Sequence, residues 1–235
     1  MTPLALLFDL DNTLAHRDLS IASYARRFVA DFGARLPGVT PDVVATLIIE
    51  RDGGGYGVPG SPFPTVRDDV ADALATRLPW RDDAPAAAAF TRHWFAHFPT
   101  CSIEMPGAGA LLDRLAAGGL RLAIVSNDQE SSRRDLARGL DLERRVGTLV
   151  SSERAGARKP QARPFLLAAQ ELGVPPERCW FVGDHPVNDV DGAHAAGMRA
   201  IWLRGFHDWP EGLQTRTTID ALAELEALLD TAAAT

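Results

Sequence analysis

Three things are scarce in this sequence: cysteine, basic charge and long apolar runs. It has only two cysteines, Cys101 and Cys179, so a disulfide framework is excluded, and their spacing does not suit a metal site. We therefore expect two reduced, packed thiols. Lysine and arginine total 24 against 31 aspartates and glutamates, which gives a net charge of -7. This balance argues against a nucleic-acid partner, whose phosphates demand a basic surface. It allows a small phosphorylated molecule, because a bound metal can reverse the local field.

Apolar residues are never gathered into the roughly 20-residue run that a membrane span needs, so we expect no membrane partner. The N-terminus has no cationic lead before an apolar stretch, and no signal peptide is predicted. The expected location is the cytoplasm. Hydrophobic residues make up 46% and charged residues 23% of the 235 positions, which is ordinary for a globular protein with a core. The length suits one large domain or two modest ones.

Short apolar runs recur along the chain, with helical patterns between them. The runs are continuously apolar rather than alternating, which is typical of a parallel sheet covered on both faces. From Met105 onward strand and helix alternate, and this order predicts a doubly wound, Rossmann-like α/β fold. The predicted strands are 4–8, 120–125, 147–150, 179–182 and 200–203, and the predicted helices between them are 108–118, 129–139, 162–173 and 190–197.

Residues 15–99 break that alternation. Helical periodicity runs through this region with no clear strand, so we predict an all-helical domain inserted over 15–99. The Rossmann-like core is then formed by 1–14 and 100–235, with a last amphipathic helix at 218–231. The helices predicted in the insertion are 21–33, 41–52, 65–78 and 84–98.

Polar side chains follow several of the predicted strands, at the edge where an open α/β sheet places its site. Taken singly, each of these residues is a weak signal. Together, in this order and at these positions, they indicate a functional site far more strongly than any one of them does alone. They are Asp9, Asp11 and Thr13 after the first strand, Ser126 and Asn127 after the second, Lys159 before a later helix, and Asp184 and Asp189 after "CWFV".

The set of motifs resembles the haloacid dehalogenase superfamily, and specifically its metal-dependent phosphatase branch. The family pattern is D-x-D-x-T, a Ser or Thr after a strand, a Lys, and a paired acidic motif such as G-D-x-x-x-x-D. The resemblance covers the whole chain, because "MPGAGALLDRLAAGGLRLAIVSN" and "GDHPVNDVDGAHAAGMRAIWL" also have the family's look. It implies that the insertion over 15–99 is a helical cap, which closes over the phosphate site and selects the substrate. One departure weakens a subfamily assignment: Gln161-Ala162 stands where related phosphatases often have Asp-Pro.

The resemblance also implies roles for the motif residues. Asp9 is the expected nucleophile and would form an aspartyl phosphate. Asp11, two residues further in an extended stretch, shares its face and can protonate the leaving alkoxide, then take a proton from water. Ser126 is expected to donate to a phosphoryl oxygen, and Lys159 to offset negative charge on the phosphate and the nucleophile. Thr13 is expected to cap and orient the loop of the first motif.

Magnesium is the expected cofactor, because acidic groups alone would repel a phosphate dianion. Its predicted ligands are the side chains of Asp9 and Asp184 and, as the family uses it, the backbone carbonyl of Asp11. Asp189 is expected in a supporting position, holding a metal-bound water or Lys159.

Residues beside the motifs give weaker predictions. Asn127 is a candidate for substrate binding, with a turn or supporting role as the alternative. His16 and Arg17, just after the first motif, are candidates for touching the leaving group. His185 lies inside the acidic motif, and a solvent-facing loop position is the favoured interpretation.

Two histidines and two arginines are given the plainer of two interpretations. His93 and His97 stand four apart on a predicted helix, a spacing that can bind metal. Aromatic residues surround them, so packing within the cap is favoured over metal binding. Arg133 and Arg134 are predicted to lie on a solvated helix face.

The predicted reaction is magnesium-dependent hydrolysis of a phosphate monoester of a small metabolite. A 2-haloacid dehalogenase shares the fold and the aspartate nucleophile, but that branch lacks the second aspartate, so Asp11 argues against it. A sugar phosphomutase would retain every motif and differs in needing a bisphosphate activator. A phospho-ligand-binding protein without catalysis should have lost a motif residue, and all are present. The ester and the oligomeric state are left open.

Overall fold

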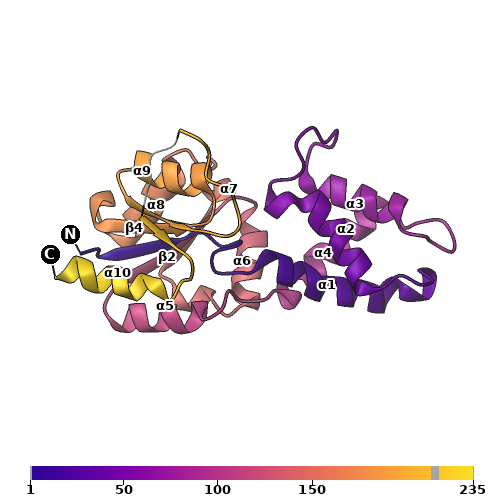
Figure 1. Ribbon diagram of the computed structural model, residues 1–235, viewed down its shortest axis with the longest axis horizontal. Coiled ribbons are helices and arrows are strands. Elements are labelled where there is room, and N and C mark those ends of the chain that lie inside the picture. The colour runs from indigo at the N-terminus through magenta and orange to yellow at the C-terminus, as the bar shows by residue number, and fades with distance from the viewer. Residues whose placement is uncertain (1, 213–216, 235) are drawn as a thin grey trace. The chain divides into compact units, whose positions relative to one another are not determined.

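The computed structural model describes residues 2–212 and 217–234 (Figure 1). It divides into two compact units, one formed by the chain up to Ala15 and from Glu104 onward, the other by His16–Ile103. Of the residues expected in the insertion, 16–99 lie in the second unit. Within the described residues, no helix has both the length and the apolar character that crossing a membrane requires.

The first unit is built on a fully parallel, six-stranded sheet with the order β3-β2-β1-β4-β5-β6. Because β1 lies between β2 and β4, the loops that follow these strands diverge at its carboxyl end, which is the switch point of the sheet. The predicted doubly wound α/β fold is confirmed. The strands are β1 (Ala5–Phe8), β2 (Arg121–Ser126), β3 (Thr148–Ser151), β4 (Cys179–Gly183), β5 (Arg199–Leu203) and β6 (Thr217–Ile219).

Helices cover both faces of this sheet, with α8 and α9 on one side and α5 and α10 on the other (Figure 1). On the α8 side, Leu7, Val125 and Phe181 of three neighbouring strands share a buried cluster with Phe165 and Leu172 of α8. All four residues of β1 are buried, which explains its continuous apolar run. The helices are α5 (Ala108–Ala117), α6 (Glu130–Gly139), α7 (Ser152–Ala155), α8 (Arg163–Leu172), α9 (Gly192–Ala195) and α10 (Glu224–Ala233), with 3-10 turns at Glu143–Arg145 and Pro176–Arg178 and a π-helical turn at Pro186–Asp191.

Two predicted helices of this unit differ from the structure. In place of a helix over 190–197, the π-helical turn Pro186–Asp191 comes first and the short α9 follows. The turn begins early because His185 Nδ1 accepts hydrogen bonds from two of its backbone amides, at 3.2 and 3.1 Å. The helix predicted over 218–231 starts too early, because β6 occupies its beginning and pairs with β5.

The second unit is all-helical. The side chains of His16, Thr40 and Thr65 cap its first three long helices by accepting a hydrogen bond from a backbone amide of the first turn. Tyr24 of the first helix and Phe98 of the last lie in a shared aromatic core, with ring centroids 6.1 Å apart. The helices are α1 (Arg17–Phe32), α2 (Pro41–Asp52), α3 (Val66–Arg77) and α4 (Ala87–Cys101), with 3-10 turns at Gly33–Arg35 and Gly53–Gly55.

Candidate active site

The loop after β1 carries the first candidate carboxylates. Asp9 N donates to Val182 O at 2.9 Å, so the backbone still pairs with β4 where the Asp9 side chain leaves the sheet. The chain then turns back on itself: Asn12 has a left-handed backbone with φ 56°, and Ala15 N donates to Leu10 O at 2.8 Å. This tight turn fixes the start of the first motif at the carboxyl edge of the sheet.

Lys159 is the cation at the centre of the site. Its Nζ donates to Asp9 Oδ1 at 2.6 Å, to Asp189 Oδ1 at 2.7 Å and to Val125 O at 3.0 Å. All three ammonium hydrogens therefore have an acceptor. The Lys159 side chain is 1% exposed. Residues far apart in the sequence thus meet at one edge of the sheet, as the strand-end pattern predicted for these three motif residues.

Three buried carboxyl groups gather here, and Lys159 contacts two of them, Asp9 and Asp189. Carboxylate oxygens of Asp9, Asp184 and Asp189 lie within 4.8 Å of one another. Burial raises the pKa of all three carboxyl groups, and the charge of Lys159 opposes that rise. Burial by itself lowers the pKa of Lys159, but the carboxylates of Asp189 and Asp9 raise it by more than burial lowers it. The pKa of Lys159 is therefore raised overall, and the ammonium stays protonated. The cluster favours a second cation.

The side chain of Asp184 shows where such a cation fits. It is 2% exposed, and its Oδ1 accepts no hydrogen bond from any described residue. A buried carboxylate oxygen without a donor is costly unless a cation or a proton meets it. Hard divalent cations such as Mg²⁺ bind carboxylate and carbonyl oxygens, and the oxygens gathered here suit one.

Two histidines belong to this site. His207, which sequence reasoning missed, places Nε2 3.3 Å from Asp184 Oδ2, and this contact raises the pKa of the His207 imidazole. His185 lies against it, with ring centroids 4.7 Å apart. The prediction of a solvent-facing His185 is wrong: the residue is half-buried, and burial lowers its pKa to about 4. The available signal for His207 was its position after β5, at the same edge of the sheet.

The acidic motif needs a glycine at position 183 for steric reasons. A Cβ built at Gly183 would lie 2.5 Å from Asp189 Cγ, so only glycine leaves room for this carboxylate. Asp189 is fully buried, and its Oδ2 accepts from His185 N at 3.0 Å while Oδ1 accepts from Lys159. The structure thus places Asp189 where it can hold the lysine.

Arg133 is a residue of the site that the sequence prediction put on the surface. That prediction is wrong, because Arg133 is buried and its Nη1 donates to Asp11 Oδ2. Its Nη2 lies 3.6 Å from Asp128 Oδ2. Arg133 is on α6, which starts just beyond β2, so its first turn lies beside the carboxyl edge of the sheet. The ion pair fixes the second carboxylate of the first motif.

Ser126 and Asn127 follow from the end of β2. Ser126 is the last residue of that strand and is 3% exposed. Asn127 holds the backbone of Lys159 from both sides: Lys159 N donates to its Oδ1 at 2.9 Å, and its Nδ2 donates to Lys159 O at 3.2 Å. These bonds correspond to the supporting role, and substrate contact by Asn127 stays a prediction.

Thr13, His16 and Arg17 complete the predicted set. Thr13 is fully buried in the turn after β1, but its hydroxyl makes no hydrogen bond with any described residue, so the predicted capping by this side chain is wrong. The other two belong to the second unit, where His16 caps α1 and Arg17 donates through Nε and Nη2 to the two carboxylate oxygens of Asp52, at 2.6 Å each. Contacts of His16 and Arg17 with a leaving group stay predictions.

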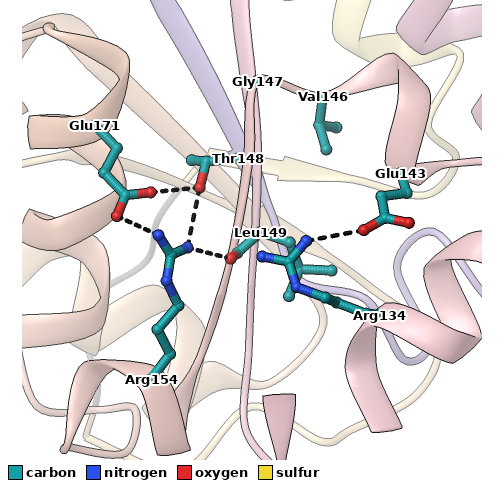
Figure 2. A pocket seen from close by; sticks show the side chains of 8 residues that line it. All are labelled: Arg134, Glu143, Val146, Gly147, Thr148, Leu149, Arg154 and Glu171. Atoms are coloured by element: carbon teal, nitrogen blue, oxygen red, sulfur yellow. Dashed lines mark hydrogen bonds and ion pairs between the residues drawn. The ribbon is translucent and has the colours of Figure 1, made fainter. Parts of the chain in front are cut away.

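A groove elsewhere on the first unit is distinct from this site. It runs along β3, the edge strand of the sheet, and is bordered by the ion pairs Arg154–Glu171 and Arg134–Glu143 (Figure 2). Arg154 Nη1 donates to Leu149 O of β3 at 2.7 Å. The arginine therefore covers part of an otherwise open strand edge, which is a structural task.

Comparisons with known proteins agree with this fold. Residues 4–197 match the family model of haloacid dehalogenase-like hydrolases. The chain is 32% identical over 205 residues to phosphoglycolate phosphatase of Rhodospirillum rubrum, covering 85% of this chain and 78% of the relative. It is 37% identical over 98 residues to phosphoserine phosphatase of Thermus thermophilus, and this match covers 42% of this chain and 39% of the relative. Among solved structures, the HAD hydrolase YfnB of Bacillus subtilis, bound to magnesium, has a TM-score of 0.74 at 19% identity, covering 98% of this chain and 100% of that one.

Proposed function

The chain belongs to the haloacid dehalogenase-like hydrolases and is a phosphatase of phosphate monoesters, and we propose that Asp9 is its nucleophile and a small phosphorylated carboxylic acid its substrate. One observation carries the assignment of the site. Lys159 bridges Asp9 and Asp189, both buried, and beside them lies the carboxylate oxygen of Asp184 that accepts no hydrogen bond from the described residues.

The proposed reaction has two halves. In the first, a carboxylate oxygen of Asp9 attacks phosphorus, the ester oxygen leaves with its electron pair, and an aspartyl phosphate forms. Asp11 gives its proton to the leaving alkoxide. In the second half, Asp11 takes a proton from water as the water oxygen attacks phosphorus. Inorganic phosphate leaves, and Asp9 is a free carboxylate again.

Two groups prepare the nucleophile and the phosphoryl group. Lys159 Nζ, 2.6 Å from Asp9 Oδ1, favours the ionised form of Asp9 and offsets the repulsion between carboxylate and phosphate. The hydroxyl of Ser126, buried at the end of β2, is assigned as a donor to a phosphoryl oxygen. Asn127 keeps Lys159 in place through the two backbone bonds described above.

Magnesium is the proposed cofactor, held by the side chains of Asp9 and Asp184 and by the backbone carbonyl of Asp11. When bound, it would neutralise charge on the phosphoryl oxygens. The support is the donor set: carboxylate oxygens of Asp9, Asp184 and Asp189 gather within 4.8 Å, and carboxylate and carbonyl oxygens suit Mg²⁺.

The proposed substrate class follows from the relatives. Phosphoglycolate phosphatase and phosphoserine phosphatase are both named for an ester that carries a carboxylate besides its phosphate. We assign the helical unit His16–Ile103 as the cap that selects the ester. His16 and Arg17 are its candidate contacts, since an imidazole N–H and a guanidinium can both donate hydrogen bonds to a substrate carboxylate.

The test is phosphate release from a panel of phosphomonoesters, with Mg²⁺ or with EDTA. The panel sets phosphoglycolate and phosphoserine against sugar phosphates and nucleoside monophosphates. Wild type is compared with Asp9→Asn and with Asp135→Asn, an exposed aspartate on α6 that serves as the matched control. We expect release that needs both Mg²⁺ and Asp9, is unchanged in the control, and is fastest with the phosphorylated acids.

Two outcomes would contradict the proposal in different ways. Full activity of Asp9→Asn would remove Asp9 as the nucleophile. Return of phosphate to the substrate, with a bisphosphate needed for activity, would identify a phosphomutase instead. A ranking led by sugar phosphates would overturn the substrate class and leave the chemistry of Asp9 standing.

A further inference from the structure

A second cluster of metal-ligating side chains lies entirely within the helical unit. His93 and His97 are one turn apart on α4, and the structure adds Asp31 from α1, which the sequence pattern did not connect with them. Asp31 Oδ2 lies 2.9 Å from His93 Nε2 and 3.9 Å from His97 Nε2. One ligand atom from each residue lies within 4.8 Å of the other two. The favoured interpretation of the two histidines, packing, describes only part of their surroundings.

We propose that Asp31, His93 and His97 bind a divalent transition metal such as Zn²⁺, independently of the phosphatase site. In a tetrahedral zinc site with bonds of about 2.0–2.1 Å, neighbouring ligand atoms lie about 3.3 Å apart. The two measured separations, 2.9 and 3.9 Å, lie on either side of this value. Small rotations of the Asp31 and His97 side chains would bring the three atoms to metal-binding distance.

The surroundings of His93 match those of a histidine that binds metal. Its side chain is 10% exposed, and its Nδ1 lies 2.8 Å from the hydroxyl of the buried Tyr24. A hydrogen bond at one ring nitrogen fixes the orientation of the ring and points the other nitrogen at the metal. Here the fixed ring directs Nε2 at Asp31.

The other two ligands leave the site open to solvent. His97 is 27% and Asp31 32% exposed by side chain, so an ion can enter and keep a water in its fourth position. Two imidazoles with one carboxylate favour zinc, cobalt, nickel or copper over magnesium. This preference is the opposite of that of the oxygen cluster in the other unit.

Arg27 is the competing cation. Its Nε donates to the same Asp31 Oδ2 at 2.6 Å, one turn away on α1. The Arg27 side chain is 47% exposed, and exposed ion pairs of this kind are weak, so the guanidinium can turn into solvent when a metal arrives. Without metal, the same atoms form a hydrogen-bonded network, which is the alternative that the experiment must separate.

A metal held here would join the first and last long helices of the unit. Asp31 lies at the end of α1, while the two histidines lie in the middle part of α4. A ligand that binds the folded unit and not the unfolded chain stabilises it. Bound metal should therefore raise the melting temperature of the protein.

The test measures zinc bound to the full-length protein by equilibrium dialysis, with Mg²⁺ in large excess. Wild type is compared with His97→Gln and Asp31→Asn. His194→Gln is the matched control, because His194 is an exposed helical histidine on α9, in the other unit. The same four proteins are titrated with Co²⁺, whose visible absorption is strong in a tetrahedral site and weak in an octahedral one, and melted with and without Zn²⁺ in excess Mg²⁺.

We expect wild type and His194→Gln to bind one more zinc per chain than His97→Gln. We also expect at least a 10-fold loss of affinity in Asp31→Asn, since even lost partners of metal ligands cost about 10- to 100-fold. With Mg²⁺ in the same large excess, zinc should raise the melting temperature of the wild type and the control only. Equal zinc binding by all four folded proteins would overturn the proposal, whatever the phosphatase assay shows.

Discussion

Removal of the Lys159 ammonium is the sharpest test of how the active site is held together. In Lys159→Met the side chain keeps much of its length and loses its charge. Asp9 and Asp189 then face each other with no compensating cation, although both are buried at 4% and 0% exposure. Breaking a buried pair by removing one partner costs about 3–5 kcal/mol, because the other charge stays buried.

The melting temperature converts this cost into an observable. A domain of 150–250 residues loses about 2–4 °C per kcal/mol, so Lys159→Met should melt roughly 6–20 °C below the wild type in EDTA. The loss should shrink on acidification, because protonation of Asp9 or Asp189 removes the uncompensated charge. Mg²⁺ should return part of the stability, since it replaces the missing positive charge.

A double variant isolates the electrostatic cause. Lys159→Met with Asp189→Asn removes the cation and one of its two carboxylates, so it should be more stable than Lys159→Met alone. Coupled neighbours of this kind differ from additivity by about 0.5–3 kcal/mol. If Lys159→Met melts within about 2 °C of the wild type in EDTA, or the double variant is less stable than the single one, the ion-pair reasoning is refuted.

Two further predictions concern Arg133 and pH. Arg133→Gln should slow hydrolysis of an alkyl ester such as phosphoglycolate by about 10- to 100-fold, because Asp11 loses its ion-pair partner. General acid-base catalysis supplies about 10²–10⁴-fold in rate, and a misplaced Asp11 should lose part of it. Turnover of 4-nitrophenyl phosphate, whose leaving group needs no proton, should fall much less, and equal losses on both esters would contradict the positioning role. Burial raises the pKa of Asp189 above its ordinary 3.8, so its stabilising contribution is fully present below pH 3.8 and is lost as pH rises through the folded-state pKa. In EDTA, the melting temperature of the wild type should therefore fall relative to Asp189→Asn as pH is raised toward neutrality, and parallel curves would count against a raised pKa.

The sequence predicts the sheet well because its strands are buried on both faces. Each of β1 to β5 is a short, mostly apolar run. A strand that is buried on both faces does not alternate between apolar and polar residues, so a continuous apolar run is enough to identify it. β6 escaped the prediction for the opposite reason. It has three residues, two of them half-buried threonines, and it lies at the edge of the sheet, so it has no apolar signature.

The site could be predicted only where a residue belongs to a strand end. Asp9 and Asp189 meet because each follows one of the neighbouring strands β1 and β4, and Lys159, in the loop between α7 and α8, reaches both carboxylates at the same edge of the sheet. Arg133 could not be found in this way, and the one signal for His207 was its position after β5. Each owes its burial or position to a partner remote in the chain, Asp11 for the arginine and Asp184 for the histidine. On an amphipathic helix, an arginine whose partner is unknown is indistinguishable from a solvated one.

The two clusters divide metal chemistry between the two units. Asp9, Asp184 and Asp189 offer oxygen only, whereas His93 and His97 add imidazole nitrogen to one carboxylate. Zinc binds most protein sites more tightly than magnesium, so zinc alone would enter both clusters and a simple count of bound ions would not separate them. Excess Mg²⁺ competes for the oxygen cluster and leaves the imidazoles to zinc. The zinc that remains bound against magnesium, and is lost with His97, therefore measures the second site alone.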